Sequence, residues 1–249
     1  MVYNTLDVLG AALALGISLK DSAAVLAKVP HVQGRVEVVP TPGKDYTILI
    51  DYAHTPDSMV NVLQTVKEFA KGRTVAVFGC GGDRDKTKRP RMGKAAADWS
   101  DFAVVTTDNP RTEEPAAIIR DILPGFDGSN TPYEVVEDRV EAIRWAMDHA
   151  QKDDVIVLCG KGHETYQEVN HQKFHMDERE IVERYEDMQR YIRETSQGKN
   201  GSHIAGIAAV ALADSLIDEW FFGGNPRESV AEAKRMAATV SYTHLRAHE

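Results

Sequence analysis

The chain has 249 residues, a length that allows one or two domains. It carries 29 Lys and Arg against 38 Asp and Glu, a net charge of −9, so we expect no general nucleic-acid surface, which would need surplus cations. With 43% hydrophobic and 27% charged residues, the composition is typical of a globular protein rather than a disordered chain. The two cysteines, Cys80 and Cys159, exclude a disulfide framework and a four-cysteine zinc site, which favours a reducing cytoplasm.

Neither apolar segment of the chain predicts a signal peptide or a membrane span. The run from Val8 to Ile17 follows no basic segment and precedes no cleavage site. The run from Ile204 to Leu216 contains Asp214 and is too short to cross a bilayer. We therefore expect a soluble, cytoplasmic protein without membrane insertion.

Short apolar runs alternate with helical patterns along the chain. Several runs are rich in Val and Ile and alternate little, which predicts strands buried on both faces. The expected strands are Arg35–Val39, Tyr46–Ile50, Thr74–Phe78, Phe102–Thr107, Tyr133–Val136 and Val155–Leu158. The expected helices are one that begins at Thr55-Pro56, where Thr55 can cap it, then Pro90–Trp99, Pro115–Leu123, Arg139–Ala150 and an amphipathic Glu180–Ile192. This alternation predicts an α/β fold with a Rossmann-like, mostly parallel sheet flanked by helices.

Four unusual loops follow these strands. In parallel sheets ligands bind beyond the carboxyl ends of the strands, and all four loops are expected at that one edge. They are Asp51–Pro56, Gly79–Pro90, Asp108–Arg111 and Gly160–Glu164. Their shared placement indicates a functional site more strongly than any single loop does.

Each loop also has a structural interpretation. Asp51 and His54 could be turn and capping residues, and Asn109-Pro110 alone is a turn dipeptide. The charged segment after the glycines at 79–82 could be a solvated loop, or an anion pocket. Arg111 could be a solvated residue that pairs with the glutamates at 113 and 114.

Two nucleotide-binding motifs are missing from the sequence. No G-x-x-x-x-G-K-[ST] segment occurs, so the chain lacks a standard triphosphate cradle of its own. No G-x-G-x-x-G segment opens a helix, which counts against a Rossmann oxidoreductase.

Taken together, the loops resemble the Mur ligase family, and within it the members that add diaminopimelate. The resemblance runs from about Val2 to Tyr191, and its further landmarks are Tyr3-Asn4-Thr5-Leu6, Gly34-Arg35-Val36-Glu37 and Asp177-Glu178-Arg179-Glu180. It implies that residues 1–32 are a helical remnant of the family's central ATPase domain and that residues 33–195 are the carboxyl-terminal, amino-acid-binding domain. Residues 196–249 form an unassigned tail, with two helices expected within 204–240 and an artefactual end at 241–249.

The resemblance implies an ATP-dependent ligase that adds meso-diaminopimelate to UDP-MurNAc-L-Ala-D-Glu in peptidoglycan biosynthesis. ATP would convert a substrate carboxylate into an acyl phosphate, which the amine of diaminopimelate then attacks. The Mg²⁺ ligands and the phosphate cradle are expected in the missing central domain, so this truncated chain is expected to be inactive alone. A sibling ligase that adds lysine, and a non-catalytic module that binds diaminopimelate or nucleotide, are the alternatives.

The family's site residues carry over to named positions of this chain. The resemblance implies that meso-diaminopimelate is bound by Arg84, Asp108, Asn109, Pro110, Arg111, Gly160 and Glu164. It implies that the nucleotide is bound by Asn4, Arg35, Asp51 and His54, and it places no catalytic residue and no metal ligand in this chain. The residue types suit a zwitterion, because Arg offers a planar fork to a carboxylate while Asp and Glu accept hydrogen bonds from an ammonium.

Overall fold

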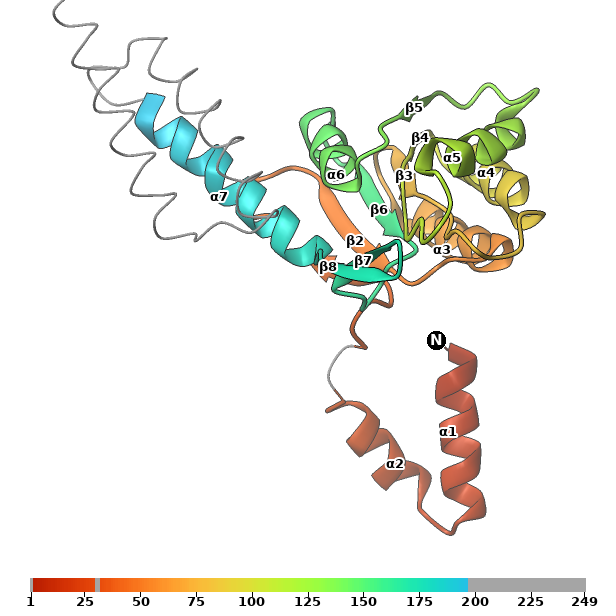
Figure 1. Cartoon of the computed structure of the whole chain (residues 1–249). Helices are drawn as coiled ribbons and strands as arrows, with labels where there is room; N and C mark the ends of the chain where they lie inside the picture. Colours follow the sequence, from red (N-terminus) through yellow and green to blue (C-terminus); the bar gives the residue numbers. More distant parts are fainter. Residues whose placement is uncertain (1, 30–31, 197–249) are drawn as a thin grey trace, which may run out of the picture.

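The computed structural model describes residues 2–29 and 32–196, and a six-stranded sheet forms its centre (Figure 1). The order of the strands is β1-β2-β6-β3-β4-β5. Their bounds are β1 Glu37–Val39, β2 Thr47–Asp51, β3 Thr74–Phe78, β4 Phe102–Val105, β5 Tyr133–Val135 and β6 Val155–Cys159. All neighbours pair in parallel except β1 and β2. The mostly parallel sheet expected from the sequence is confirmed, and the expected tail helices within 204–240 lie outside the described residues.

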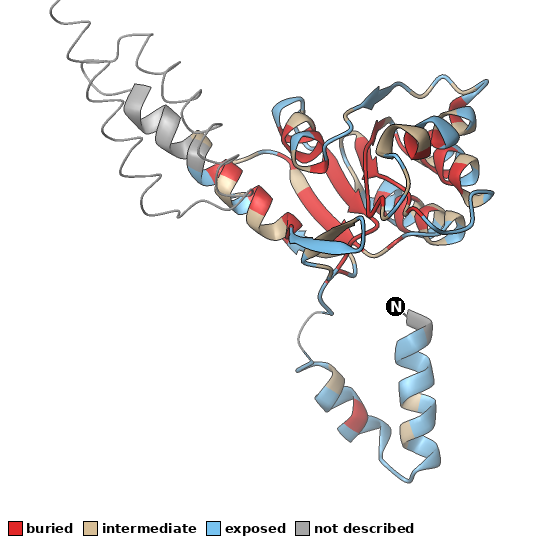
Figure 2. Cartoon of the chain, in the orientation of Figure 1, coloured by how far each residue is buried: buried red, intermediate tan, exposed pale blue. Residues whose placement is uncertain are grey.

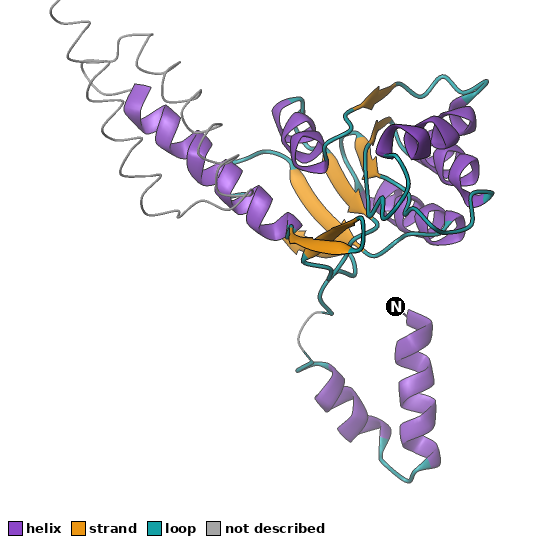
Figure 3. Ribbon diagram, in the orientation of Figure 1, coloured by secondary structure: helices purple, strands orange, loops and turns teal. Residues whose placement is uncertain are grey.

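Helices cover both faces of the sheet, as Figure 3 shows. One face packs against α3 (Pro56–Phe69), α4 (Lys88–Trp99), α5 (Pro115–Ile122) and the short 3-10 helix Leu123–Phe126. The other face packs against α6 (Arg139–Asp148) and α7 (Glu178–Ser196). β2, β3 and β6 are almost wholly buried because helices lie on both sides of them, which explains their runs of Val, Ile and Leu.

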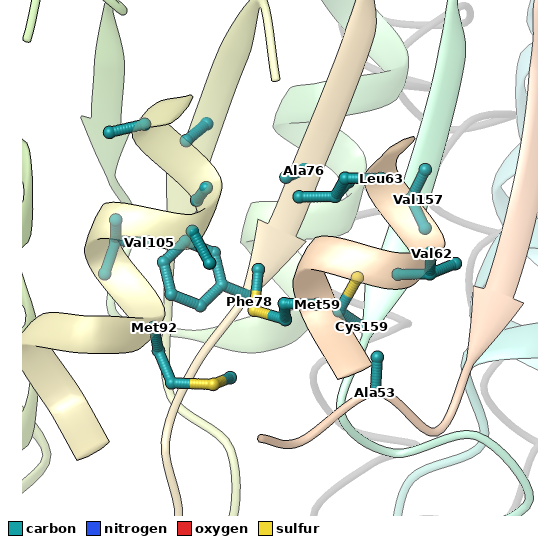
Figure 4. Packing of buried hydrophobic residues seen from close by; sticks show 14 of the residues in the cluster. Ala53, Met59, Val62, Leu63, Ala76, Phe78, Met92, Val105, Val157 and Cys159 are labelled. Carbon is teal, nitrogen blue, oxygen red and sulfur yellow. The ribbon is translucent and has the colours of Figure 1, made fainter. Parts of the chain in front are cut away.

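A hydrophobic core lies between the sheet and the helices α3, α4 and α5. Within it, the ring of Phe78 of β3 lies near Met59 of α3 and Met92 of α4 (Figure 4). The helix that supplies Met59 begins where the sequence predicts. Thr55 caps it, because its hydroxyl accepts a hydrogen bond from the Ser58 amide, and the Ser58 hydroxyl accepts one from the Thr55 amide. This capping box fixes the point at which the chain turns from the loop after β2 into the helix.

The sequence does not predict one element, a β-hairpin formed by β7 (Tyr166–Val169) and β8 (Gln172–His175). Its two turn residues, Asn170 and His171, have φ values of 48° and 63°, as a two-residue type I′ turn requires. An asparagine in this position, between two short runs, is a signal that could have revealed the hairpin.

The structure adds the direction of β1 and changes the bounds of two expected elements. β1 runs antiparallel to β2, since the seven residues between them, 40–46, are too few for a crossover connection. The helix expected at Glu180 begins at Glu178 instead. β4 ends at Val105, and the buried Thr106 and Thr107 lead into the loop that follows.

At the amino terminus, α1 (Val2–Ala14) and α2 (Leu19–Leu26) are joined by a short turn and are largely exposed (Figure 2). Their apolar side chains find little cover within the described residues; about half or more of the surface is exposed at Leu6, Val8, Leu13, Leu15, Ile17, Leu19 and Val25. A helix pair with so little buried apolar surface lacks the packing that normally stabilises helices. It is therefore not an independent folding unit.

One buried ion pair joins three elements close to the sheet edge where the loops meet. Arg139 of α6 and Glu178 of α7 are both fully buried, with 2.7 Å between Nη2 and Oε1. Arg139 also donates to the backbone carbonyl of Cys159, at the end of β6, over 2.9 Å. Removing one partner of such a pair leaves an uncompensated buried charge.

We predict that Arg139→Met lowers the free energy of unfolding by about 3–5 kcal/mol, because Glu178 loses its partner in a site that water does not reach. Urea denaturation followed by circular dichroism measures the loss. The double variant Arg139→Met/Glu178→Met is the control, and it should recover most of the stability. A single-variant loss below about 1 kcal/mol would contradict the assignment.

Candidate functional site

The four loops predicted to share one edge of the sheet converge on a single cavity of about 530 Å³. The loop after β2 contributes His54, the glycine-rich loop Arg84, the loop after β4 Asp108, and the loop after β6 Glu164. The full lining is Tyr52, His54, Thr55, Gly81, Arg84, Lys88, Asp108, Asn109, Arg111, Gly160, Glu164, Tyr166 and Glu168. Six of the seven residues predicted to bind an amino acid therefore meet in one cavity.

The seventh, Pro110, is buried and does not line the cavity. Its backbone carbonyl lies directly against Gly82, at the place where a Cβ on that glycine would have to sit. The Gly82 amide donates to the Asn109 carbonyl over 2.9 Å. Pro110 thus helps to pack the glycine-rich loop against the loop after β4.

The unpredicted hairpin forms one wall of the cavity and is bonded to the Asp108–Arg111 loop. The Gln167 side chain donates to the Asp108 carbonyl over 2.7 Å, and the Glu168 amide donates to Asn109 Oδ1 over 2.9 Å. The Arg111 amide donates to the Glu168 carbonyl over 3.0 Å. These bonds make the hairpin and the loop one unit.

The Arg111 side chain makes its hydrogen bonds within the protein and is not a solvated surface residue. Its Nη1 donates to the Gly82 carbonyl over 2.9 Å, and its Nε lies 3.2 Å from Glu168 Oε2. The side chain is only 18% exposed. The alternative that Arg111 pairs with Glu113 at the surface is wrong, since Glu113 pairs with Arg89 and Lys86 instead.

Beneath the cavity, Lys161 is completely buried. Its Nζ lies 2.8 Å from Asn109 Oδ1, 3.3 Å from Glu164 Oε2 and 3.9 Å from Asp108 Oδ1. The Asn109 amide nitrogen donates to the same Glu164 oxygen over 2.9 Å. Burial lowers the pKa of Lys161, while the charge of Asp108 opposes that shift.

Charged side chains of both signs line the cavity in equal number. Arg84, Lys88 and Arg111 supply three cations, and Asp108, Glu164 and Glu168 supply three carboxylates. Arg84 is exposed and bonds only within its own loop, to the Asp83 carbonyl over 3.2 Å. A lining of this kind suits a ligand that carries both charges rather than a simple anion.

The predicted nucleotide residues are only partly brought together. Arg35 lies over the ring of Tyr52 at 5.3 Å, and the His54 ring lies 4.6 Å from the same ring. Asp51 is buried and accepts a hydrogen bond from the Val36 amide over 2.8 Å. Burial raises the pKa of Asp51. Its hydrogen bond to the Val36 amide holds the chain just before β1. Asn4 is exposed on α1 and does not line the cavity.

Several residues of the site were not singled out from the sequence, among them Lys161, Tyr166 and Glu168. Lys161 lies inside a predicted loop, but a lysine between two glycines suggests an exposed phosphate ligand rather than a buried one. The other two lie on the unpredicted hairpin.

Among residues 2–29 and 32–196, no three His, Cys, Asp or Glu side chains gather as a metal site would require. Over the same part of the chain, no helix is long and apolar enough to span a membrane.

Comparison with known proteins gives consistent matches. The family model described as "Mur ligase, glutamate ligase domain" matches residues 34–162. The UDP-N-acetylmuramoyl-L-alanyl-D-glutamate–2,6-diaminopimelate ligase of Clostridium botulinum is 51% identical over 183 residues, which cover 73% of this chain and 38% of that protein. The protein of the same name from Caldanaerobacter subterraneus subsp. tengcongensis is 52% identical over 181 residues, with 73% and 37% covered.

Solved structures agree with these matches. One of a UDP-N-acetylmuramoyl-L-alanyl-D-glutamate–2,6-diaminopimelate ligase superposes with a TM-score of 0.59 and 39% identity, over 73% of this chain and 37% of that one. The UDP-N-acetylmuramate-alanine ligase of Thermotoga maritima, at 24% identity and a TM-score of 0.54, shares the fold over 78% of this chain and 38% of its own. This chain thus spans less than two thirds of the length of each relative.

The backbone conformation of Gly160 and its close approach to Asp108 can be tested by substitution. Its φ of 116° is one that residues with a side chain rarely adopt, and a Cβ there would lie 2.9 Å from Asp108 Oδ2. We predict that Gly160→Ala lowers the free energy of unfolding by about 2–3 kcal/mol, from backbone strain and displacement of that carboxylate.

The matched control is Gly128→Ala, because Gly128 also has a positive φ, 75°, but has nothing near its missing Cβ. Urea denaturation of both variants separates backbone strain from the clash with Asp108. Equal losses would show that the approach of Gly160 to Asp108 contributes nothing.

Proposed function

The chain belongs to the Mur ligase family, and we propose that it supplies the amino-acid-binding part of an ATP-dependent ligase that adds meso-diaminopimelate to UDP-MurNAc-L-Ala-D-Glu in peptidoglycan biosynthesis. Relatives that are 51% and 52% identical over 73% of the chain carry the name of that enzyme. The observation that carries the proposal is the cavity lining, which holds three cations and three carboxylates. Diaminopimelate has an ammonium and a carboxylate at each end, so such a lining complements it.

The reaction begins when ATP transfers its terminal phosphoryl group to the substrate carboxylate, which gives an acyl phosphate and ADP. The free amine of diaminopimelate attacks the acyl carbon, a tetrahedral intermediate forms, and phosphate leaves as the amide forms. The task of this chain is to hold the amino acid with its amine directed toward that carbon. Positioning of this kind supplies a large part of the rate enhancement in a two-substrate reaction.

Within the cavity we assign the two charges of the far end of diaminopimelate to different residues. Arg111 faces the carboxylate, with Arg84 as a second cation, because the Arg111 fork is fixed on one side by Gly82 and Glu168. Asp108 and Glu164 accept hydrogen bonds from the ammonium. Asn109, Pro110 and Gly160 keep these groups in place, as the bonds and close approaches described above support.

The nucleotide would meet this chain at the rim of the cavity. We propose that Arg35 and His54, which lie against Tyr52, contact the nucleotide there, that the buried Asp51 supports them from behind, and that Asn4 joins them from the central domain. Magnesium would be held outside the described residues, which offer no cluster of ligands for it.

The exposed apolar surface of α1 and α2 supports the proposed division into domains. Residues 1–32 would form part of the central ATPase domain, whose remainder would cover Leu6, Val8 and their neighbours. Residues 33–195 would form the amino-acid-binding domain, and residues 196–249 stay unassigned. The cytoplasm, where ATP is available, is the proposed location.

We predict that Arg111→Ala weakens diaminopimelate binding to this chain about a hundredfold and leaves lysine binding nearly unchanged. Diaminopimelate loses the charged partner of its far carboxylate, which weakens its binding free energy by on the order of 3 kcal/mol. Lysine has no carboxylate at that end, so its binding free energy does not depend on Arg111. Calorimetric titration of both amino acids measures the two affinities. Arg120→Ala, on the exposed side of α5, is the matched control.

An equal loss for both amino acids, or no loss for either, would refute the assignment of Arg111. Tighter binding of lysine than of diaminopimelate by the unchanged chain would instead favour the lysine-adding alternative. The two results are distinct, because the first concerns one residue and the second concerns the substrate.

We also predict that the chain of residues 1–249 forms no tripeptide amide when given ATP, magnesium and both substrates. The sequence holds no G-x-x-x-x-G-K-[ST] cradle, so the acyl phosphate cannot form on it. Mass spectrometry of the UDP-linked product checks this. ATP-dependent tripeptide formation by the purified chain would contradict it.

A further inference from the structure

Lys161 is a charged residue that the proposed function leaves unexplained. It follows β6, and its side chain has no exposed surface, so it cannot touch a ligand in the cavity. Placing an ammonium group out of reach of water is costly unless other groups compensate it. Its partners are three of the residues assigned to the substrate, namely Asp108, Asn109 and Glu164.

The first consequence of Lys161 concerns the orientation of the Asn109 amide. Asn109 Oδ1 receives hydrogen bonds from Lys161 Nζ and from the Glu168 amide, over 2.8 Å and 2.9 Å. Both are donors, so this atom must be the amide oxygen. The amide nitrogen must then point the other way, and it donates to Glu164 Oε2 over 2.9 Å.

The second consequence concerns the carboxylates. Glu164 Oε2 is held by Lys161 and Asn109 together, which leaves Oε1 for a ligand. Asp108 lies within 3.9 Å of the same ammonium group. Two carboxylates that share one cation repel each other less than two carboxylates without it, so Lys161 favours the placement of Asp108 and Glu164 on the same side of the cavity.

We propose that Lys161 is the positioning residue for the ammonium half of the substrate: from below the cavity it fixes the Asn109 amide and holds Asp108 and Glu164 as the pair that accepts an ammonium group. This inference rests on the proposed function, since it concerns the same cavity. Selection for an amino group then depends on Lys161, a residue that the substrate never contacts.

A purely structural role for Lys161 makes a different prediction. In that case Lys161 only fills space beneath the hairpin, where its Nζ lies 5.4 Å from the centre of the Tyr166 ring. Its loss would then loosen the whole site, and every ligand would bind more weakly by a similar factor. The positioning role predicts a selective loss, confined to ligands with an amino group.

The test compares two ligands that share one carbon chain, meso-diaminopimelate and heptanedioate, the dicarboxylate without amino groups. Each is titrated into the full chain and into Lys161→Met, and binding is followed by backbone amide chemical shifts, which remain measurable for weak ligands. We expect diaminopimelate to bind at least 30-fold more weakly to the variant, and heptanedioate to change less than threefold.

Lys94→Met is the matched control, because it removes one lysine charge at an exposed pair with Asp98 on α4. It should leave both affinities as they are. If Lys161→Met does not fold, Lys161→Gln carries the same comparison, since it removes the charge that lies beside Asp108 and Glu164.

Equal weakening of both ligands in a folded variant, or no weakening of either, overturns the inference and leaves the proposed function standing. Failure of the unchanged chain to bind diaminopimelate at all overturns the proposed function and this inference with it. The unchanged chain therefore reports on the function, and the variant reports on Lys161.

Discussion

The side chain of Asn109 joins the three segments from which the cavity is built. It belongs to the loop after β4, its oxygen binds Lys161 and the backbone of Glu168 in the hairpin, and its nitrogen binds Glu164. A buried amide with three partners has almost no freedom to rotate, so these segments keep a fixed separation. Such a network rigidifies a site only when each member is satisfied, which is the case for this amide.

The sheet beneath these segments makes the arrangement possible. Parallel strands end at one edge, so β2, β3, β4 and β6 all place their following loops there, and the helices on both faces of the sheet leave that edge open. Backbone groups must then approach closely, and Gly82 and Gly160 stand where a Cβ would meet Pro110 or Asp108. The charged groups of the site therefore rest on tight backbone packing rather than on long, mobile side chains.

Much of this fold could be predicted from the sequence, for identifiable reasons. Buried strands such as β3 are continuous apolar runs, and the start of α3 is set by Thr55 and Pro56 themselves. Both features depend only on neighbouring residues, so the sequence predicts them. The convergence of the loops follows from the parallel order of the strands. The hairpin could not be predicted from hydrophobic periodicity, because its strands are short and contain no buried residue: β7 is partly exposed and β8 is exposed throughout. The burial of Lys161 depends on contacts between distant segments, and no local pattern records those.

The pairing of Arg111 with Glu168 connects this architecture to selectivity. An internal carboxylate beside the arginine lowers the attraction of the cavity for anions in general, because it occupies Nε before any ligand arrives. A carboxylate from a ligand must then approach the remaining side of the guanidinium, and only a chain of suitable length and direction can do so. The ammonium of the same ligand meets Asp108 and Glu164, whose carboxylates lie 3.9 Å and 3.3 Å from Lys161 Nζ. A cavity whose charges are already paired internally therefore binds simple ions weakly. It binds most tightly a ligand that presents a carboxylate and an ammonium group at the matching positions.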